Sequence, residues 1–224
     1  MPLYKSTYHS KTFRDFKEIE SDNFRRIIHF YEEREETIRG LDFEEYFELL
    51  IAYVNGLFEV GFHKKHLLMV DVAIAEAINN NVQYFEGEDI FEKLLFRKAA
   101  SHYRRLELKE CDHVLRELIR INPYHEHGIL FLKKCLRRME PLFFNRAKAG
   151  SVFLFLLSAF IISLEVLFIR PFYSLYTDQV ELTRNGIFAL GLLLLIGGFL
   201  LHRLRVERKV EQFVREQRTA KSSC

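Results

Sequence analysis

Two long apolar runs near the C-terminus limit the folds open to this chain more than any other feature. Residues 150–169 (GSVFLFLLSAFIISLEVLFI) hold a single charged side chain, Glu165, and residues 186–201 (GIFALGLLLLIGGFLL) hold none. A helix of about 20 residues crosses the roughly 30 Å hydrocarbon core of a bilayer. We therefore expect a transmembrane hairpin at 150–202, with spans at 150–169 and 186–202. The alternative, two core helices of a soluble protein, needs a large apolar partner surface that the rest of the chain does not supply.

Basic residues flank the two runs on the sides away from their connection. Six Lys or Arg lie within 133–148 and six within 203–218, whereas the connection 170–185 holds two. Cytoplasmic flanks carry the excess of Lys and Arg, so both termini are expected in the cytoplasm. The polar N-terminus lacks a signal-peptide pattern, and three cysteines at unrelated spacings are typical of reduced thiols. We expect a two-span integral protein of a bacterial inner membrane, because no organellar or secretory signal is present.

Small and charged residues recur every seven positions in both runs. They are Ser151, Ser158 and Glu165 in the first run, and Arg184, Gly191 and Gly198 along the second. In an antiparallel hairpin the two stripes face each other, and small residues let the helix backbones approach closely. A charge inside a membrane span requires a partner, which predicts an ion pair between Glu165 and Arg184. A role for Glu165 in an ion or proton path is the functional alternative.

The first 149 residues are expected to form an all-α cytoplasmic domain. Apolar side chains recur there at intervals of three and four residues, and Gly, Asn and Pro mark the ends of the segments. Asp22 is the expected N-cap of the first helix, and no segment alternates with the period of a strand. The expected helices cover 22–40, 42–60, 63–79, 88–106, 110–121 and 125–139. The tail 203–224 is expected to continue the second span as a basic amphipathic cytoplasmic helix.

Residues 99–123 (AASHYRRLELKECDHVLRELIRINP) resemble a tetratricopeptide repeat. The matching positions are Ala100, Tyr103, Cys111, Leu115, Leu118 and Pro123. Residues 42–79 look like a degenerate second copy. The resemblance covers about 100 residues and implies a stack of antiparallel helical hairpins whose first helices form a groove for a protein partner.

The resemblance places Arg97, Ser101 and Arg104 in that groove. Two arginines would favour an acidic partner or a C-terminal carboxylate. The family's carboxylate-binding arrangement, however, uses an asparagine where this chain has Ser101. The other interpretation is that these arginines simply solvate an outer face.

Charge is divided unevenly along the expected domain. Residues 15–48 hold 12 acidic and 5 basic side chains, whereas residues 97–148 hold 13 basic and 6 acidic ones. The basic part, next to the spans, is expected to attract anionic lipid headgroups. The acidic part is expected to project into the cytoplasm, where a basic partner could meet it. The formal net charge of +2 and the lack of a binding module argue against nucleic acid.

No arrangement of catalytic residues is evident in the sequence. His63 and His66 have no further metal ligand nearby, and the pair Glu110 and His113 lacks the second pair that a di-iron site needs. We expect no enzyme activity, metal or cofactor. The sequence favours a membrane-tethered scaffold or adaptor that recruits a protein partner, with small-residue faces that also allow a homo-oligomer. The alternative is an accessory or pore-forming subunit that acts through its hairpin.

Overall fold

The computed structural model describes residues 9–139, 142–169 and 177–222. Within these ranges ten α-helices account for most of the chain, so the all-α prediction is confirmed. Cys224 and the first half of the loop expected at 170–185 lie outside the described residues. Contacts divide the chain into two compact units, residues 1–131 and 132–224. This division falls inside a helix, 18 residues before the expected domain boundary at 149.

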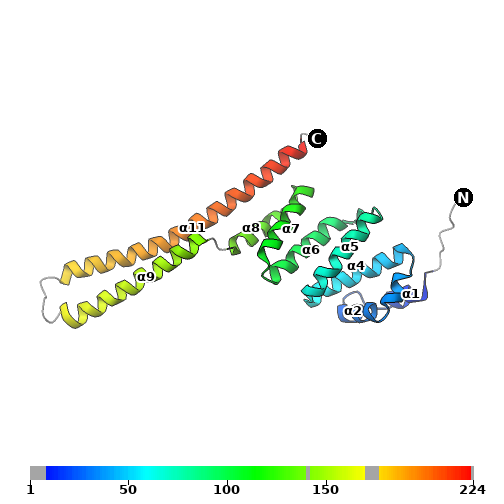
Figure 1. Cartoon of the computed structure of the whole chain (residues 1–224), viewed down its shortest axis with the longest axis horizontal. Helices are drawn as coiled ribbons and strands as arrows, with labels where there is room; N and C mark the ends of the chain where they lie inside the picture. The colour runs from blue at the N-terminus through cyan, green and yellow to red at the C-terminus, as the bar shows by residue number, and fades with distance from the viewer. Residues whose placement is uncertain (1–8, 140–141, 170–176, 223–224) are drawn as a thin grey trace. The chain divides into compact units, whose positions relative to one another are not determined.

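The first unit consists of short and medium helices that follow one another in space as in sequence (Figure 1). They are α1 (Lys11–Lys17), α2 (Phe24–Glu33), α3 (Glu35–Arg39), α4 (Phe43–Val60), α5 (His63–Asn79), α6 (Ile90–Arg104) and α7 (Leu108–Ile121). Helix α8 (Glu126–Arg138) begins in this unit and ends in the second. Helix α4 packs against α2 and α5, and α6 packs against α5 and α7.

Close approach of α2 to α4 depends on a glycine and on two stacked rings. A Cβ atom at Gly56 would lie 3.3 Å from Ile28 Cγ1 and 3.4 Å from the Phe24 carbonyl oxygen. The rings of Tyr31 and Tyr53 stack with their centroids 4.2 Å apart. These rings and the leucines of α4 belong to the buried core of this unit.

Several helix ends differ from the sequence prediction. The segment expected as one helix at 22–40 is two helices, because Arg34 leaves the helical conformation (φ −119°, ψ 20°). The N-cap is Asn23 instead of Asp22, and its side chain accepts a hydrogen bond from the Arg26 amide. Gly61 ends α4 in the left-handed conformation (φ +87°), as expected of a C-terminal glycine.

The prediction that the chain contains no strand is wrong for one short segment. Strands β1 (Tyr84–Phe85) and β2 (Glu88–Asp89) pair antiparallel, with Phe85 opposite Glu88. Glu86 and Gly87 connect them with φ angles of +52° and +81°, the signs that a tight two-residue hairpin turn requires. Asp89 then caps α6 by accepting a hydrogen bond from the Glu92 amide.

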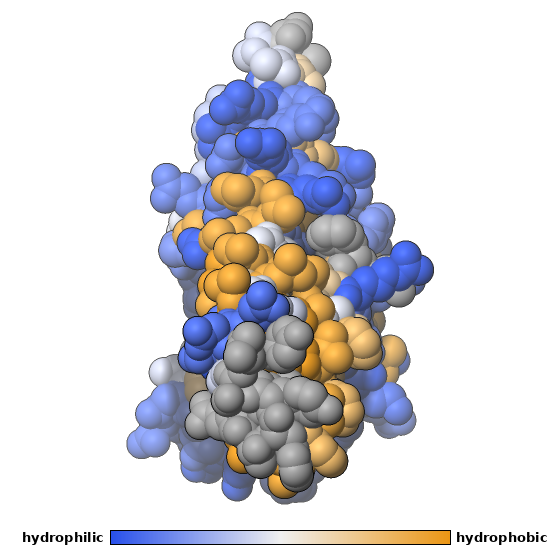
Figure 2. Space-filling view, turned by 90° about the vertical axis from the view of Figure 1, so that its left-hand side faces the viewer, coloured by the Kyte–Doolittle hydropathy of each residue, from blue (hydrophilic) through white to orange (hydrophobic). Residues whose placement is uncertain are grey.

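The second unit contains the two apolar helices as an antiparallel hairpin (Figure 1). Helix α9 (Leu142–Leu164) continues as a π-helical turn at Glu165–Ile169, and α11 (Thr177–Ser222) is unbroken for 46 residues. Both are long and apolar enough to cross a membrane. Core helices of a soluble protein are mostly buried, whereas only 17% and 11% of the most apolar windows are buried here. Apolar side chains accordingly gather on the hairpin surface that faces the viewer in Figure 2.

The expected helical tail is present as the last five turns of α11. Val206, Val210 and Val214 follow one another at intervals of four residues and are all buried. The opposite charges of α8 and α11 meet beside them. Lys133 Nζ lies 3.5 Å from Glu211 Oε1, and Arg137 Nη2 lies 2.8 Å from Glu207 Oε1. The second unit therefore includes the end of α8 and the tail as well as the hairpin.

Candidate functional site

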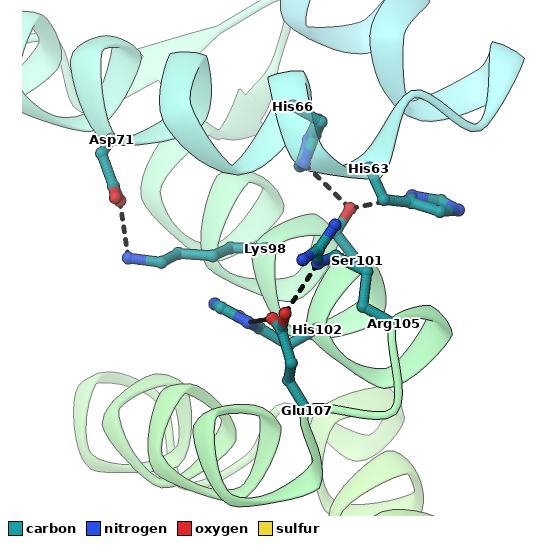
Figure 3. A network of polar contacts seen from close by, with 8 residues as sticks. All are labelled: His63, His66, Asp71, Lys98, Ser101, His102, Arg105 and Glu107. Carbon is teal, nitrogen blue, oxygen red and sulfur yellow. Dashed lines mark hydrogen bonds and ion pairs between the residues drawn. The ribbon is translucent and has the colours of Figure 1, made fainter.

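The three residues predicted to line a partner groove lie in different environments on α6. Ser101 is fully buried, so it offers no surface to a partner. Its Oγ lies 2.9 Å from His66 Nδ1 and 3.2 Å from His63 Nδ1, which places it in the interface between α5 and α6 (Figure 3). Arg104 is exposed at the end of α6.

Arg97 is engaged by α4. Its Nη1 donates a hydrogen bond to Asn55 Oδ1 at 2.7 Å, its Nη2 lies 3.4 Å from Glu59 Oε1, and its guanidinium lies over the Phe58 ring. Burial lowers the pKa of Arg97 more than Glu59 raises it. The charge is therefore held between two helices of the same domain, and these residues do not form the basic groove that the sequence suggested.

The two histidines and Ser101 form a structural link between α5 and α6. Burial, reinforced by the Arg97 charge, lowers the pKa of His66 to about 4, so its ring is neutral near pH 7. The Ser101 hydroxyl can donate its proton to one ring while its oxygen accepts from the other. Within the described residues, His66 Nε2 is buried and has no hydrogen-bond partner. A serine this inaccessible cannot act as a nucleophile toward a substrate.

A second polar group in Figure 3 fixes the turn between α6 and α7. Glu107 receives both His102 Nδ1 and Arg105 Nε at 2.8 Å, and these contacts lower the pKa of the Glu107 carboxyl. In the part of the chain that the structure describes, no three His, Cys, Asp or Glu side chains come together in a way that could hold a metal ion.

The small residues of the two apolar helices meet along one seam. Ser151 and Ser158 are buried on α9. On α11, a Cβ atom at Gly191 would lie 3.2 Å from Leu154 Cβ, and one at Gly198 would lie 3.2 Å from Ala147 Cβ. By contrast, a Cβ atom at Gly186 or Gly197 would meet nothing within 4 Å. The glycines at heptad spacing thus face α9, and the other two face away from it.

The seam ends in the ion pair between the two helices. Arg184 Nη1 donates a hydrogen bond to Glu165 Oε2 at 2.8 Å, and Arg184 Nη2 lies 3.4 Å from Glu181 Oε1. The Glu165 side chain is fully buried, at the residue where α9 changes to the π-helical turn. A buried carboxylate is tolerated when a hydrogen-bonded cation compensates its charge, and Arg184 supplies that cation.

A hollow lined by both apolar and polar side chains in the first unit was not foreseen from the sequence. It has a volume of about 480 Å³ and lies among α1, α2, α4 and the β1–β2 turn. Its apolar lining consists of Phe16, Ile19, Phe24, Ile27, Ile51, Ala52 and Phe85, and its polar lining of Lys17, Ser21, Glu48, Asn55 and Glu86. Two of its walls come from the segment after α1 and from the β1–β2 hairpin. A helical spacing of apolar residues predicts neither of these two segments. The acidic composition of residues 15–48 was the one available signal that this region differs from the rest.

Comparison of the chain with protein-family models, with curated proteins and with solved structures finds no match.

Proposed function

We propose that this chain is a membrane-tethered adaptor, in which the α9–α11 hairpin is the anchor and the first unit receives a protein partner in the cytoplasm. One observation carries the proposal. The hairpin presents apolar side chains outward along both helices, whereas the first unit has its own buried core beneath a charged surface. An apolar exterior suits lipid and a charged exterior suits water.

Helix pairing in the first unit supports a repeat of tetratricopeptide type. Helices α4 and α5 are joined at Gly61, and α6 and α7 are joined by a short turn at Arg105–Glu107, so that two helical hairpins follow each other. Stacked hairpins of this kind leave extended surfaces that suit protein partners. The basic flanks of the hairpin favour an orientation with both termini in the cytoplasm, close to anionic headgroups.

A pore or accessory subunit that acts through the hairpin is the second candidate. The observation in its favour is the buried carboxylate of Glu165. Its hydrogen bond to Arg184 supplies a structural reason for that carboxylate, however, because the pair neutralises both charges at the seam. We therefore favour an anchoring role for the hairpin.

The test is purification of the tagged full chain from its native membrane in mild detergent, with co-purifying proteins quantified by mass spectrometry and the particle mass measured alongside. The adaptor proposal expects a stoichiometric partner that is lost when residues 1–131 are removed and retained in Glu165→Gln. A large homo-oligomer without a partner would contradict it. Loss of the biological activity in Glu165→Ala, with assembly intact, would favour the hairpin as the active element.

A further inference from the structure

A second hollow in the first unit lies where α5 begins, beside the turn that follows α6. It has a volume of about 500 Å³, and we call it the basic pocket after its lining, which consists of Gly61, Phe62, His63, Lys64, Lys65 and Arg105. Within the described residues no acidic side chain lines it. Two separate segments supply its cations, because the lysines belong to the first turn of α5 and Arg105 belongs to the turn between α6 and α7.

The balance of charge around the basic pocket is positive. The carboxylates nearest to its lining are already held by cations, in the pairs Glu32 with Lys65 at 2.9 Å, Glu107 with Arg105 at 2.8 Å and Glu59 with Arg97 at 3.4 Å. After burial, the charges of Arg104 and Arg105 lower the pKa of His63, so both guanidinium groups lie close to that lining residue. Lys64 and Arg104 are exposed and form no ion pair within the described residues. These two cations are therefore available to an anionic ligand.

The Arg105 guanidinium is held in place by a neighbouring contact. Glu107 lies 2.8 Å from Arg105 Nε and 2.8 Å from His102 Nδ1 (Figure 3). In the part of the chain that the structure describes, Nη1 and Nη2 of Arg105 have no partner, so they remain donors for a ligand. The first turn of α5 contains no acidic residue, and the positive end of this helix adds to the charge of the pocket.

The basic pocket is open to solvent. Phe62 is 51% exposed, and Lys64 and Arg105 are exposed as well. Because small-molecule sites enclose most of their ligand, this pocket suits a charged group that projects from a larger molecule. The Phe62 ring beside the cations offers an apolar contact to the atoms next to that group.

From these observations we propose that the basic pocket binds a phosphorylated side chain of the protein partner, with an apolar side chain of the same segment packed on Phe62. The proposal rests on the adaptor function proposed above. A phosphoryl group carries a charge of about −1.5 to −2 at pH 7 and three acceptor oxygens. These match the two unpaired cations, Lys64 and Arg104, and the remaining donors of Arg105. A carboxylate, with one charge and two oxygens, matches them less well.

The chain offers substitutions that remove the unpaired cations, and a matched pair elsewhere. Lys64→Gln with Arg104→Gln takes two exposed charges from the pocket. The control, Arg25→Gln with Lys109→Gln, takes two exposed charges from α2 and α7 that likewise form no ion pair within the described residues. Phe62→Ala removes the ring and leaves every charge in place. Circular dichroism and thermal melting show whether each variant is folded.

The experiment measures binding of fluorescent peptides to the full chain in nanodiscs of phosphatidylcholine, with empty nanodiscs as the blank. The peptides share one sequence in which Leu follows a central phosphoserine, Asp or Ser, and a fourth peptide has Gly in place of Leu after the phosphoserine. We expect the phosphoserine peptide with Leu to bind best and the Ser peptide to bind worst.

The variants are expected to separate the charge from the apolar contact. Lys64→Gln with Arg104→Gln should weaken the phosphoserine peptide by about tenfold or more, whereas the control pair should bind it like the wild type. Phe62→Ala should weaken the phosphoserine peptide that contains Leu and leave the one that contains Gly unchanged.

Several results would overturn the proposal. These are equal binding of the phosphoserine and Ser peptides, unchanged binding by the folded Lys64→Gln and Arg104→Gln variant, and equal losses in this variant and its control. Displacement of the peptide at lower concentrations by inorganic phosphate, or by a soluble short-chain phosphatidic acid, than by unlabelled phosphopeptide would identify a free phosphate or a lipid headgroup as the ligand instead.

Purification from the native membrane distinguishes failure of the pocket from failure of the adaptor function. If a partner co-purifies with the wild type and the folded Lys64→Gln and Arg104→Gln variant retains it, the pocket is wrong and the adaptor function stands. If the peptides bind as expected but no partner co-purifies, the pocket stands and the adaptor function fails.

Discussion

Replacement of Gly198 and of its neighbour Gly197 by leucine tests whether the seam sets the separation of α9 and α11. The two positions are adjacent in the same helix. A Cβ atom at 198 would lie 3.2 Å from Ala147 Cβ and 3.7 Å from Phe144 Cδ2, whereas one at 197 would meet nothing within 4 Å. Ala147 Cβ is fixed to the α9 backbone and cannot rotate away, so the remaining atoms of a leucine side chain at position 198 would have to displace α9.

The difference between the two variants isolates the packing contribution. Replacing a helical glycine by a better helix former stabilises by about 0.5–1 kcal/mol, and this gain is the same at both positions. Overpacking at 198 costs about 1–3 kcal/mol. We therefore expect Gly197→Leu to be neutral or slightly stabilising, and Gly198→Leu to be less stable than Gly197→Leu by about 1–3 kcal/mol.

The free energies of unfolding of the two leucine variants can be measured by reversible unfolding in mixed micelles. Increasing mole fractions of sodium dodecyl sulfate drive the unfolding, and circular dichroism follows it. Equal stability of the two leucine variants would refute the seam as the determinant of helix separation. Gly198→Ala is expected to change stability little, because its smaller packing cost and its gain in helix propensity oppose each other.

Three further predictions concern the ion pair and the first unit. Glu165→Gln and Arg184→Gln should each lower the free energy of unfolding in the same micelle assay by about 3 kcal/mol, and the double variant by less than their sum; additive losses would contradict the pairing. The pKa of His66 is about 4 when folded and ordinarily 6.5, so the unfolded chain binds the extra proton between these values. The first unit should therefore keep its full stability above about pH 6.5 and lose up to about 3 kcal/mol toward pH 4, a slope absent from His66→Leu in urea titrations. Gly61→Ala should lower the melting temperature at a cost of about 1 kcal/mol, because alanine at φ +87° is strained, whereas Gly40→Ala at φ −88° should not.

The helices of this chain could be predicted because residues at or next to their ends mark where each helix begins and stops. The boundaries expected for 42–60 and 63–79 agree with α4 and α5 to within a residue, since Gly61 separates two strongly periodic segments. The break at Arg34 and the hairpin at Glu86 and Gly87 were missed for a different reason. A two-residue strand has too few positions to show an alternation, and a single non-helical residue leaves the periodicity around it almost unchanged.

The close packing of α9 against α11 could be predicted from the sequence because small residues recur at a fixed interval of seven positions in both helices. Pairing of Glu165 with Arg184 follows once two antiparallel helices are aligned at their small residues. The buried environment of Ser101 could not be predicted from the sequence, because it depends on His63 and His66, which lie 38 and 35 residues away on another helix. Tertiary neighbours of this kind convert a serine expected at the surface into a buried one, and they draw Arg97 toward Asn55.

Because α11 is continuous, the tail from residue 203 to residue 222 is a direct continuation of the second apolar helix. A helix of 46 residues is about 69 Å long, and neither proline nor a described non-helical residue interrupts it. A rotation or an axial shift of the apolar part of this helix is therefore expected to reach Val206, Val210 and Val214. The salt links from Glu207 and Glu211 pass the same displacement to the end of α8. The charged end of α11 and the end of α8 are therefore expected to move together with the apolar part of α11.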